Sequence, residues 1–297
     1  SQRAAAFILT AAMLTTLAAP AFAGTWYIED GDITVKAGET KGTNKVSQGA
    51  NQEVEDTDTI ITNRDKDTAS SNTVTIEAEK KDDKVEVTLK DVNIDTSSRN
   101  KAAVSVTGEG DTNIKLNGDN ALKSDTYRSG IYGSGSLTIS GGENDSLTAQ
   151  GGSGADGIYS SGSLTISGGT VTANGDDGGR GIYSSGSVTI SGGSTVTANG
   201  ESGTISGGDG ICSSGGVTIS GGSTVTANGG NGGSLVGGDG IPRGRGPTRP
   251  PGTATPQGGA GARHARRGAR PHPRAGGRPL PRPDGHAARR RRGAHTG

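Results

Sequence analysis

The sequence predicts an all-β protein built mainly from a parallel β-helix, and three observations lead to this fold class. Only 28% of the 297 residues are hydrophobic and 3% aromatic, while 55 are glycine, which is too little apolar mass for an ordinary globular core. One sequence motif, composed mainly of Gly, Ser, Thr and Val, recurs several times. Within each copy, apolar and polar residues alternate with period two, which predicts strands. Stacked repeats can build one continuous core from few apolar residues per copy.

Four copies of the repeat begin with Gly-Ile, and their lengths are 27, 24, 29 and 30 residues. They span residues 130–156, 157–180, 181–209 and 210–239. A constant repeat motif followed by a segment of variable length is typical of stacked coils with a loop on one side, because insertions are tolerated where the backbone faces water. Two units with fewer glycines precede them, residues 72–100 and 102–129. We therefore expect about six coils within residues 72–241.

Each copy contains three short runs that predict three strands. In "SLTIS", Leu164 and Ile166 fall on one face and Thr165 on the other. "TVTAN" places Val196 and Ala198 inward in the same way, and "GIY" supplies one buried isoleucine. Glycine pairs between the runs allow backbone corners. A single coil buries too few side chains to offset its backbone entropy, so only a stack of coils is stable.

The chain begins with a predicted secretory signal peptide, residues 1–23. Arg3 precedes a short apolar run that ends in "AFA" at residues 21–23, a small-x-small pattern that signal peptidase accepts. We expect cleavage before Gly24 and a location outside the cell or on a cell surface. A membrane anchor is the alternative, but the apolar run is too short to span a bilayer. No transmembrane anchor is expected further on, and residues 24–71 are expected to form an N-terminal β region that caps the repeats.

Residues 242–297 differ from the repeats, since they hold 14 arginines, one acidic residue and ten of the eleven prolines. Such a segment cannot bury a core and is predicted to be disordered. One interpretation is a basic arm that contacts polyanions; the other, which we favour, is a GC-rich gene read out of frame from about residue 242. A secreted β-helix has no evident use for such an arm, so no nucleic-acid partner is expected.

If the array stops at Ile241, its last coil lacks a polar cap, which predicts end-to-end self-association of residues 24–241.

Three aspartates occupy one position of the repeat, directly before Gly-Ile: Asp156, Asp209 and Asp239. Carboxylates on successive coils repel one another unless a hard cation or hydrogen bonds offset the charge. Calcium is therefore a candidate cofactor, and solvated turn aspartates are the alternative interpretation. The segment "GGSGADGIY" matches the nonapeptide of calcium-binding β-rolls, but that architecture needs consecutive nine-residue copies, whereas the period here is 24 to 30 residues.

Threonines are expected to stack in two outward columns, which form the candidate ligand-binding faces. The first column is Thr138, Thr165, Thr189 and Thr218, and the second is Thr148, Thr172, Thr197 and Thr226. One interpretation is that threonine simply suits exposed strand positions. The other is a flat, hydroxyl-bearing surface suited to a polysaccharide or, as a weaker candidate, to ice.

The repeats do not supply a catalytic arrangement. All four histidines lie in the tail, and beyond Lys123 the repeats contain only Arg128 and Arg180 as cations. No nucleophile with a base and an orienting group can be assembled, so we expect no enzymatic activity. The single cysteine, Cys212, stands where other copies have tyrosine. We interpret it as a drifted structural position, with a reactive thiol as the alternative.

The text "GDGI.SSG.VTISGG.TVTANG" resembles the coils of a family of secreted bacterial right-handed β-helix proteins that bind carbohydrates. The family includes surface repeat proteins of gut bacteria and is related in shape to pectate lyases. The likeness covers about residues 27–241 and implies a right-handed helix with calcium at the acidic position, which carries over to Asp156, Asp209 and Asp239. Arg180 departs from that pattern in the second of the four copies.

These observations predict a secreted or cell-surface module that binds a polysaccharide or cell-surface glycan without catalysing a reaction, with calcium as an assisting ion. The alternative is an adhesin-like structural stalk that binds no glycan. The two differ in whether a lateral face of the coil stack binds glycan.

Overall fold

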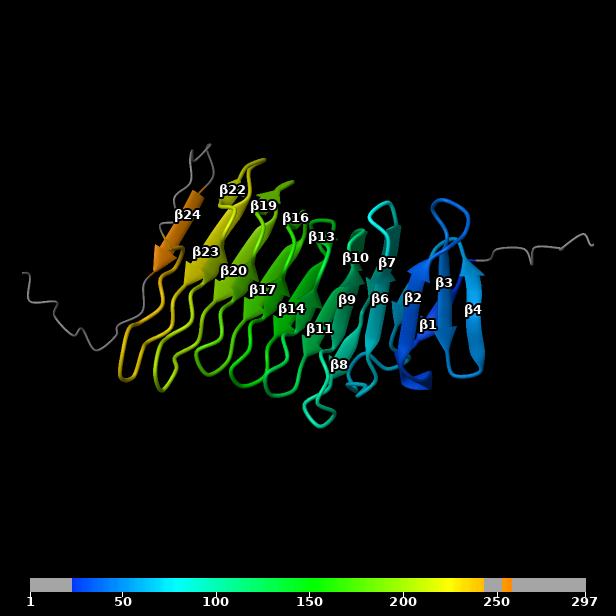
Figure 1. The fold of residues 1–297 in the computed structure, drawn as a ribbon, viewed down its shortest axis with the longest axis horizontal. Coiled ribbons are helices and arrows are strands. Elements are labelled where there is room, and N and C mark those ends of the chain that lie inside the picture. The colour runs from blue at the N-terminus through cyan, green and yellow to red at the C-terminus, as the bar shows by residue number, and fades with distance from the viewer. Residues whose placement is uncertain (1–22, 243–252, 258–297) are drawn as a thin grey trace, which may run out of the picture. The chain divides into compact units, whose positions relative to one another are not determined.

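Three sheets run along a stack of coils, and each complete coil gives one strand to each sheet (Figure 1). The computed structural model describes residues 23–242 and 253–257. Within them, six consecutive coils with three strands each lie between residues 74 and 228. The predicted all-β fold of stacked parallel coils is confirmed. Apart from the 3-10 turn η1 (Ile28–Asp30), no helix occurs in this part of the chain, and none is long and apolar enough to cross a membrane.

The first sheet has nine strands in the order β21-β18-β15-β12-β9-β6-β2-β3-β4. Its coil strands are β6 (Val74–Ala78), β9 (Val104–Gly108), β12 (Ile131–Gly133), β15 (Ile158–Ser160), β18 (Ile182–Ser184) and β21 (Ile211–Ser213). The other three are β2 (Ile33–Ala37), β3 (Asn44–Gln48) and β4 (Asn51–Asp56). These three form an antiparallel meander, and β2 joins it to the coils by pairing in parallel with β6.

The second sheet has eight parallel strands and the third has seven. The eight-stranded sheet contains β1 (Thr25–Tyr27), β5 (Ile60–Thr62), β7 (Lys84–Lys90), β10 (Asp111–Asn117), β13 (Ser136–Ser140), β16 (Leu164–Ser167), β19 (Val188–Ser191) and β22 (Val217–Ile219). The seven-stranded sheet contains β8 (Asn93–Asp95), β11 (Asp119–Lys123), β14 (Ser146–Gln150), β17 (Thr170–Asn174), β20 (Thr195–Asn199), β23 (Thr224–Asn228) and β24 (Thr253–Gln257).

Inward positions stack as columns of like residues, which form the core. Ile131, Ile158, Ile182 and Ile211 are in register and fully buried. The other two sheets add columns of leucine or valine, of isoleucine and of alanine in the same way. Several serines that turn inward at the corners have partners, as where Ser184 Oγ donates to Gly162 O at 2.8 Å, whereas among the described residues the buried Thr112 Oγ1 and Ser223 Oγ have none. The core therefore combines apolar columns with buried hydroxyls, most of which are hydrogen-bonded.

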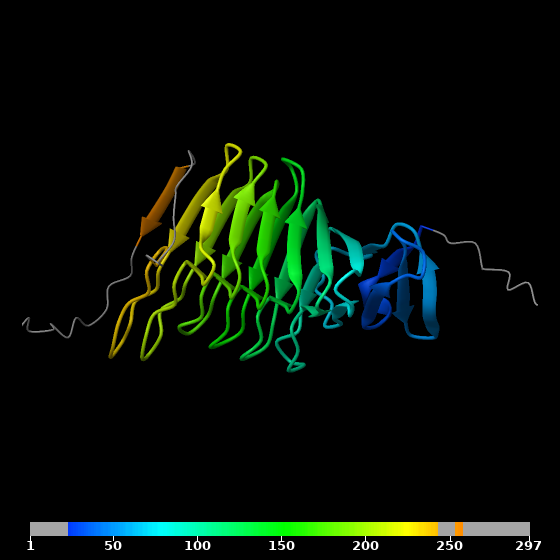
Figure 2. The same ribbon diagram turned by 45° about the horizontal axis from the view of Figure 1, so that its top comes forward.

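Repeat length varies at more than one corner of the coil, and the longest insertions follow the strands of the seven-stranded sheet. The segments that follow β17, β20 and β23 span residues 175–181, 200–210 and 229–240. They lie side by side along the stack (Figure 2), and Leu235 N donates to Ile205 O at 2.9 Å between the two longest. The longest insertions therefore lie in loops on one side, as the sequence predicts. The difference between the first two copies lies elsewhere, in residues 141–145 between β13 and β14 against 168–169 between β16 and β17.

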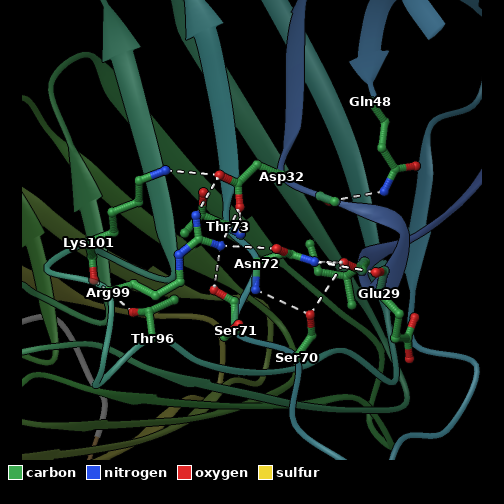
Figure 3. Close-up of polar contacts among 12 residues, drawn as sticks. Glu29, Asp32, Gln48, Ser70, Ser71, Asn72, Thr73, Thr96, Arg99 and Lys101 are labelled. Atoms are coloured by element: carbon green, nitrogen blue, oxygen red, sulfur yellow. Dashed lines mark hydrogen bonds and ion pairs between the residues drawn. The ribbon is translucent and has the colours of Figure 1, made fainter. Parts of the chain in front are cut away.

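The N-terminal region is joined to the coils by a polar cluster around Asp32, which directly precedes β2. The Asp32 carboxylate accepts hydrogen bonds from Thr73 N at 2.9 Å, from Arg99 Nη1 at 3.1 Å and from Lys101 Nζ at 2.9 Å (Figure 3). Burial alone would raise the pKa of Asp32, but the hydrogen bonds from Lys101 and Thr73 and the charges of Lys101 and Arg99 lower it below its ordinary value. The cluster thus holds an ionised carboxylate between the cap and the first coils.

Five residues of the predicted tail form a strand that the sequence analysis did not anticipate. β24, the orange strand in Figure 1, pairs in parallel with β23 so that Thr253 lies opposite Thr224. Its text "TATPQ" keeps the alternation of "TVTAN". Residues 1–22, 243–252 and 258–297 lie outside the described residues, and with them the predicted signal peptide apart from Ala23 and the rest of the predicted disordered tail.

Candidate ligand-binding groove

A column of stacked tyrosines lies on the outer face of the nine-stranded sheet. Tyr132, Tyr159 and Tyr183 are in register on β12, β15 and β18. The ring centroids are 5.1 Å apart in the first pair and 5.2 Å in the second, with interplanar angles of 3° and 28°. The sequence "GIY" explains the column, because strand alternation turns the isoleucine inward and the tyrosine outward in each of these three coils. Each stacked pair adds about 0.5–1.5 kcal/mol beyond its area burial.

The tyrosine column ends at Tyr132. The position in register before it is Ser105 on β9, and the one before that is Thr75 on β6. These short side chains cannot cover an aromatic ring, and Tyr132 is 44% exposed. One face of the Tyr132 ring is therefore accessible to a ligand, whereas its other face packs on Tyr159.

A groove of about 790 Å³ opens at this end of the tyrosine column. Its lining combines hydroxyl, aromatic and charged side chains: Thr75, Ser105, Tyr127, Arg128, Tyr132, Tyr159 and Asp156. Aromatic faces accept the apolar C–H face of a sugar ring, and the surrounding groups can donate to or accept from its hydroxyls. The groove therefore has the mixed character of a small-molecule or glycan site.

Two cations border the groove, Lys101 and Arg128. Lys101 is oriented by its hydrogen bond to Asp32 (Figure 3). Arg128 Nε donates to Asn100 Oδ1 at 3.3 Å. The groove thus lies directly beside the cluster that joins the cap to the coils.

The predicted acidic position forms a column beside the tyrosines, with an arginine in its middle. Arg180 N donates to Asp156 Oδ1 at 2.8 Å. The guanidinium lies 4.0 Å from Asp156 Oδ2 and 4.0 Å from Asp209 Oδ2, and its Cζ lies 4.7 Å from the centroid of the Tyr183 ring. Asp239 continues the column, since its backbone N donates to Asp209 Oδ1 at 2.8 Å. Arg180 therefore links the acidic column to the tyrosine column.

Burial raises the pKa of two groups near Arg180. Asp156 is 9% exposed, and this burial raises the pKa of its carboxyl although Arg180 acts to lower it. Burial likewise raises the pKa of the Cys212 thiol, which occupies the tyrosine position on β21. A raised pKa reduces the thiolate fraction, which supports the structural interpretation of this cysteine.

The three predicted calcium residues do not form a cation cage. Calcium takes about six to eight oxygen ligands. Here the Arg180 guanidinium stands between Asp156 and Asp209, and backbone N–H groups take up one oxygen of each carboxylate. In the described part of the chain, no group of three or more His, Cys, Asp or Glu side chains is placed to hold a metal ion. The residues at this position do not fit calcium, because Arg180 already supplies a positive charge there.

The two predicted threonine columns are present, but they belong to different sheets. Thr138, Thr165, Thr189 and Thr218 are in register on the eight-stranded sheet. Thr148, Thr172, Thr197 and Thr226 are in register on the seven-stranded sheet. Thr138 of the first column also lines a separate groove of about 510 Å³, together with Asn113 and Glu86. The structure therefore does not bring the two columns together, and neither lines the groove at Tyr132.

Sequence analysis missed two columns that the structure places on the surface. One is the tyrosine column, whose signal was a tyrosine at the same position after Gly-Ile in three copies. The other is a ladder of side-chain amides, in which Asn199 Nδ2 donates to Asn174 Oδ1 at 2.8 Å and Asn228 Nδ2 donates to Asn199 Oδ1 at 2.7 Å. Both follow from the rule that parallel register superposes identical residues.

No protein-family model matches the chain, and neither does any curated protein or solved structure. The resemblance to carbohydrate-binding β-helix proteins accordingly stays a prediction.

Proposed function

We propose that this chain is a secreted or cell-surface module that binds a polysaccharide in the groove at Tyr132, without catalysing a reaction on it. The observation that carries this proposal is the accessible ring face of Tyr132 at the end of an aromatic stack, within a groove lined by hydroxyls and charges. A pyranose ring has an apolar C–H face and equatorial hydroxyls. The first packs on the Tyr132 ring, and the second hydrogen-bond to Ser105 and Arg128.

A polymer fits this surface better than a free sugar does. The groove lining includes Tyr159 beside Tyr132, with ring centroids 5.1 Å apart, so a chain of sugar rings has more than one aromatic side chain to contact. Several weak contacts along one chain add up through effective concentration. The predicted calcium dependence is not retained, since Arg180 occupies the centre of the acidic column.

The test is retention on insoluble polysaccharides and a glycan array, with Tyr132→Ala as the decisive variant. Losing an aromatic contact worth about 1.4 kcal/mol lowers affinity about tenfold. Tyr27→Ala is the matched control, because Tyr27 is 36% exposed and stacks with Arg64 in the N-terminal region, away from the groove. Thr165→Ala tests the predicted threonine face separately.

We expect the wild type and Tyr27→Ala to be retained equally, in calcium and in chelator, and Tyr132→Ala to be released. If Tyr132→Ala is retained as well as the wild type, the groove is not the binding site. If Thr165→Ala loses retention instead, the threonine column is the binding face. A folded wild type that is retained on no polysaccharide would favour the structural stalk.

A further inference from the structure

Asp56 is a buried carboxylate without a cationic side chain beside it. It is the last residue of β4, and it is 0% exposed. Its Oδ2 accepts a hydrogen bond from Trp26 Nε1 at 2.7 Å, and its Oδ1 accepts from Gly24 N at 2.9 Å and from Asp58 N at 3.1 Å. Within the described residues, no lysine, arginine or histidine forms an ion pair with it. A buried carboxylate is costly unless a positive charge or a full set of donors compensates for it.

The nearest backbone nitrogen to this carboxylate belongs to the residue that follows the predicted cleavage site. Gly24 is buried, whereas Ala23 is exposed. Gly24 is also held in place from its other end, because Ile60 N donates to Gly24 O at 3.0 Å. Gly24, the residue directly after "AFA", is thus held by hydrogen bonds at both its N–H and its carbonyl.

We propose that cleavage between Ala23 and Gly24 creates the missing cation, an α-ammonium group on Gly24 that pairs with the buried Asp56 carboxylate. Signal peptidase hydrolyses the peptide bond with one water molecule. The oxygen of that water becomes part of the Ala23 carboxylate, and the Gly24 nitrogen becomes an ammonium group. The nitrogen already lies at ion-pair distance from Asp56 Oδ1. No rearrangement of the cap is needed to form the pair.

The pair makes the cap of the processed chain differ from that of the precursor. In the precursor the same nitrogen is a neutral amide with a single N–H, whereas the ammonium group carries a full charge and three donors. Removing one partner of a buried ion pair is strongly unfavourable, so the processed cap is stabilised by both members. The inference concerns folding of the secreted chain and does not depend on glycan binding.

The test compares chains that differ by one residue at the N-terminus. One begins at Gly24, and the other keeps Ala23, so its ammonium group is displaced by about 3.8 Å. Each is made with Asp56 and with Asp56→Asn, and both otherwise run to residue 297. The melting temperature of the four proteins at pH 7 gives a double-mutant cycle. The N-terminal residue of the chain recovered after secretion is read by mass spectrometry.

We expect the chain that begins at Gly24 to melt at least about 3 °C above the chain that keeps Ala23. Asp56→Asn should abolish that difference. Nα-acetylation of the chain that begins at Gly24 should lower its melting temperature to that of the longer chain, and this measurement suffices if Asp56→Asn does not fold. Equal melting temperatures, a difference that persists in Asp56→Asn, or a secreted chain that begins at another residue would overturn the proposal.

Discussion

Arg180 shows how one residue changes the chemistry of a repeated position. Successive coils place Asp156, Arg180, Asp209 and Asp239 one above another before Gly-Ile. A column of aspartates alone would repel, but the guanidinium lies 4.0 Å from carboxylate oxygens on both neighbouring coils. Its guanidinium also lies over the Tyr183 ring, so a cation–π contact stabilises this end of the tyrosine column.

Arg180→Gln should lower the free energy of unfolding at pH 7 by about 1 kcal/mol, because solvent screens a pair whose arginine is partly exposed. The groups that face Arg180 are Asp156, Asp209, Cys212 and the ring of Tyr183. The pKa of Asp156 is already raised, so its ionised form is disfavoured in the folded state. As the pH falls through that raised pKa, the carboxyl becomes neutral and the contribution of Arg180 declines. The difference from wild type should therefore shrink between pH 7 and pH 4.

Denaturant unfolding at the two pH values measures this difference, with Lys66→Gln as a charge-matched control at an exposed loop position. Arg180→Lys, which keeps the charge, should recover part of the loss. A loss of the same size at both pH values, shared by Arg180→Lys, would make Arg180 a packing residue only.

At the scale of the element, glycine sets how closely the corner segments can stack. Gly179 and Gly208 lie at equivalent places in the loops that lead into β18 and β21, and Gly238 takes the same place in residues 229–240. A Cβ on Gly208 would lie 1.9 Å from Gly179 O, and a Cβ on Gly238 would lie 1.9 Å from Gly208 O. The backbones of neighbouring coils are thus in direct contact here, and any side chain would force them apart.

Gly208→Ala should destabilise the protein by about 2–3 kcal/mol, the cost of overpacking a rigid site. Gly133→Ala is the matched control, because its Cβ would meet nothing closer than Leu137 Cδ2 at 3.5 Å and serine stands there in other coils. Thermal unfolding of both variants measures the contrast. Equal stability of the two variants would show that the corner relaxes to accept a side chain.

The strands and their register follow from the sequence, while several contacts between segments do not. Period-two alternation and near-identical copies determine which residues stack, as the threonine columns and the buried isoleucines show. The Asp32 cluster could not be foreseen, because it joins Asp32 to Arg99 and Lys101, some 67 and 69 residues further along the chain. The groove could not be foreseen either, since it depends on where the tyrosine column stops.

At the scale of the whole molecule, the two ends of the coil stack differ in how their last strands are covered. The antiparallel strands β3 and β4 close one end of the nine-stranded sheet. At the other end β24 covers β23, while β21 and β22 are the last strands of their sheets in the described residues. A parallel strand edge without a partner can pair with another chain.

Residues 24–241 should therefore self-associate more strongly than the full chain, because removing β24 also exposes the edge of β23. Sedimentation velocity over a range of concentrations measures the difference. A strictly monomeric 24–241 fragment at high concentration would contradict this prediction, and equal association of both proteins would show that β24 does not protect the edge.

The place where the tyrosine column stops has a consequence for how this gene can evolve. Copies as alike as those that begin at Gly157 and Gly181 favour unequal crossing-over, which adds or deletes whole coils. Each added coil lengthens the stack by about 4.8 Å. Because most of the groove lining precedes those copies, and each further copy would again supply a tyrosine at the position of Tyr159, such duplications change the length of the stack while the groove keeps its lining.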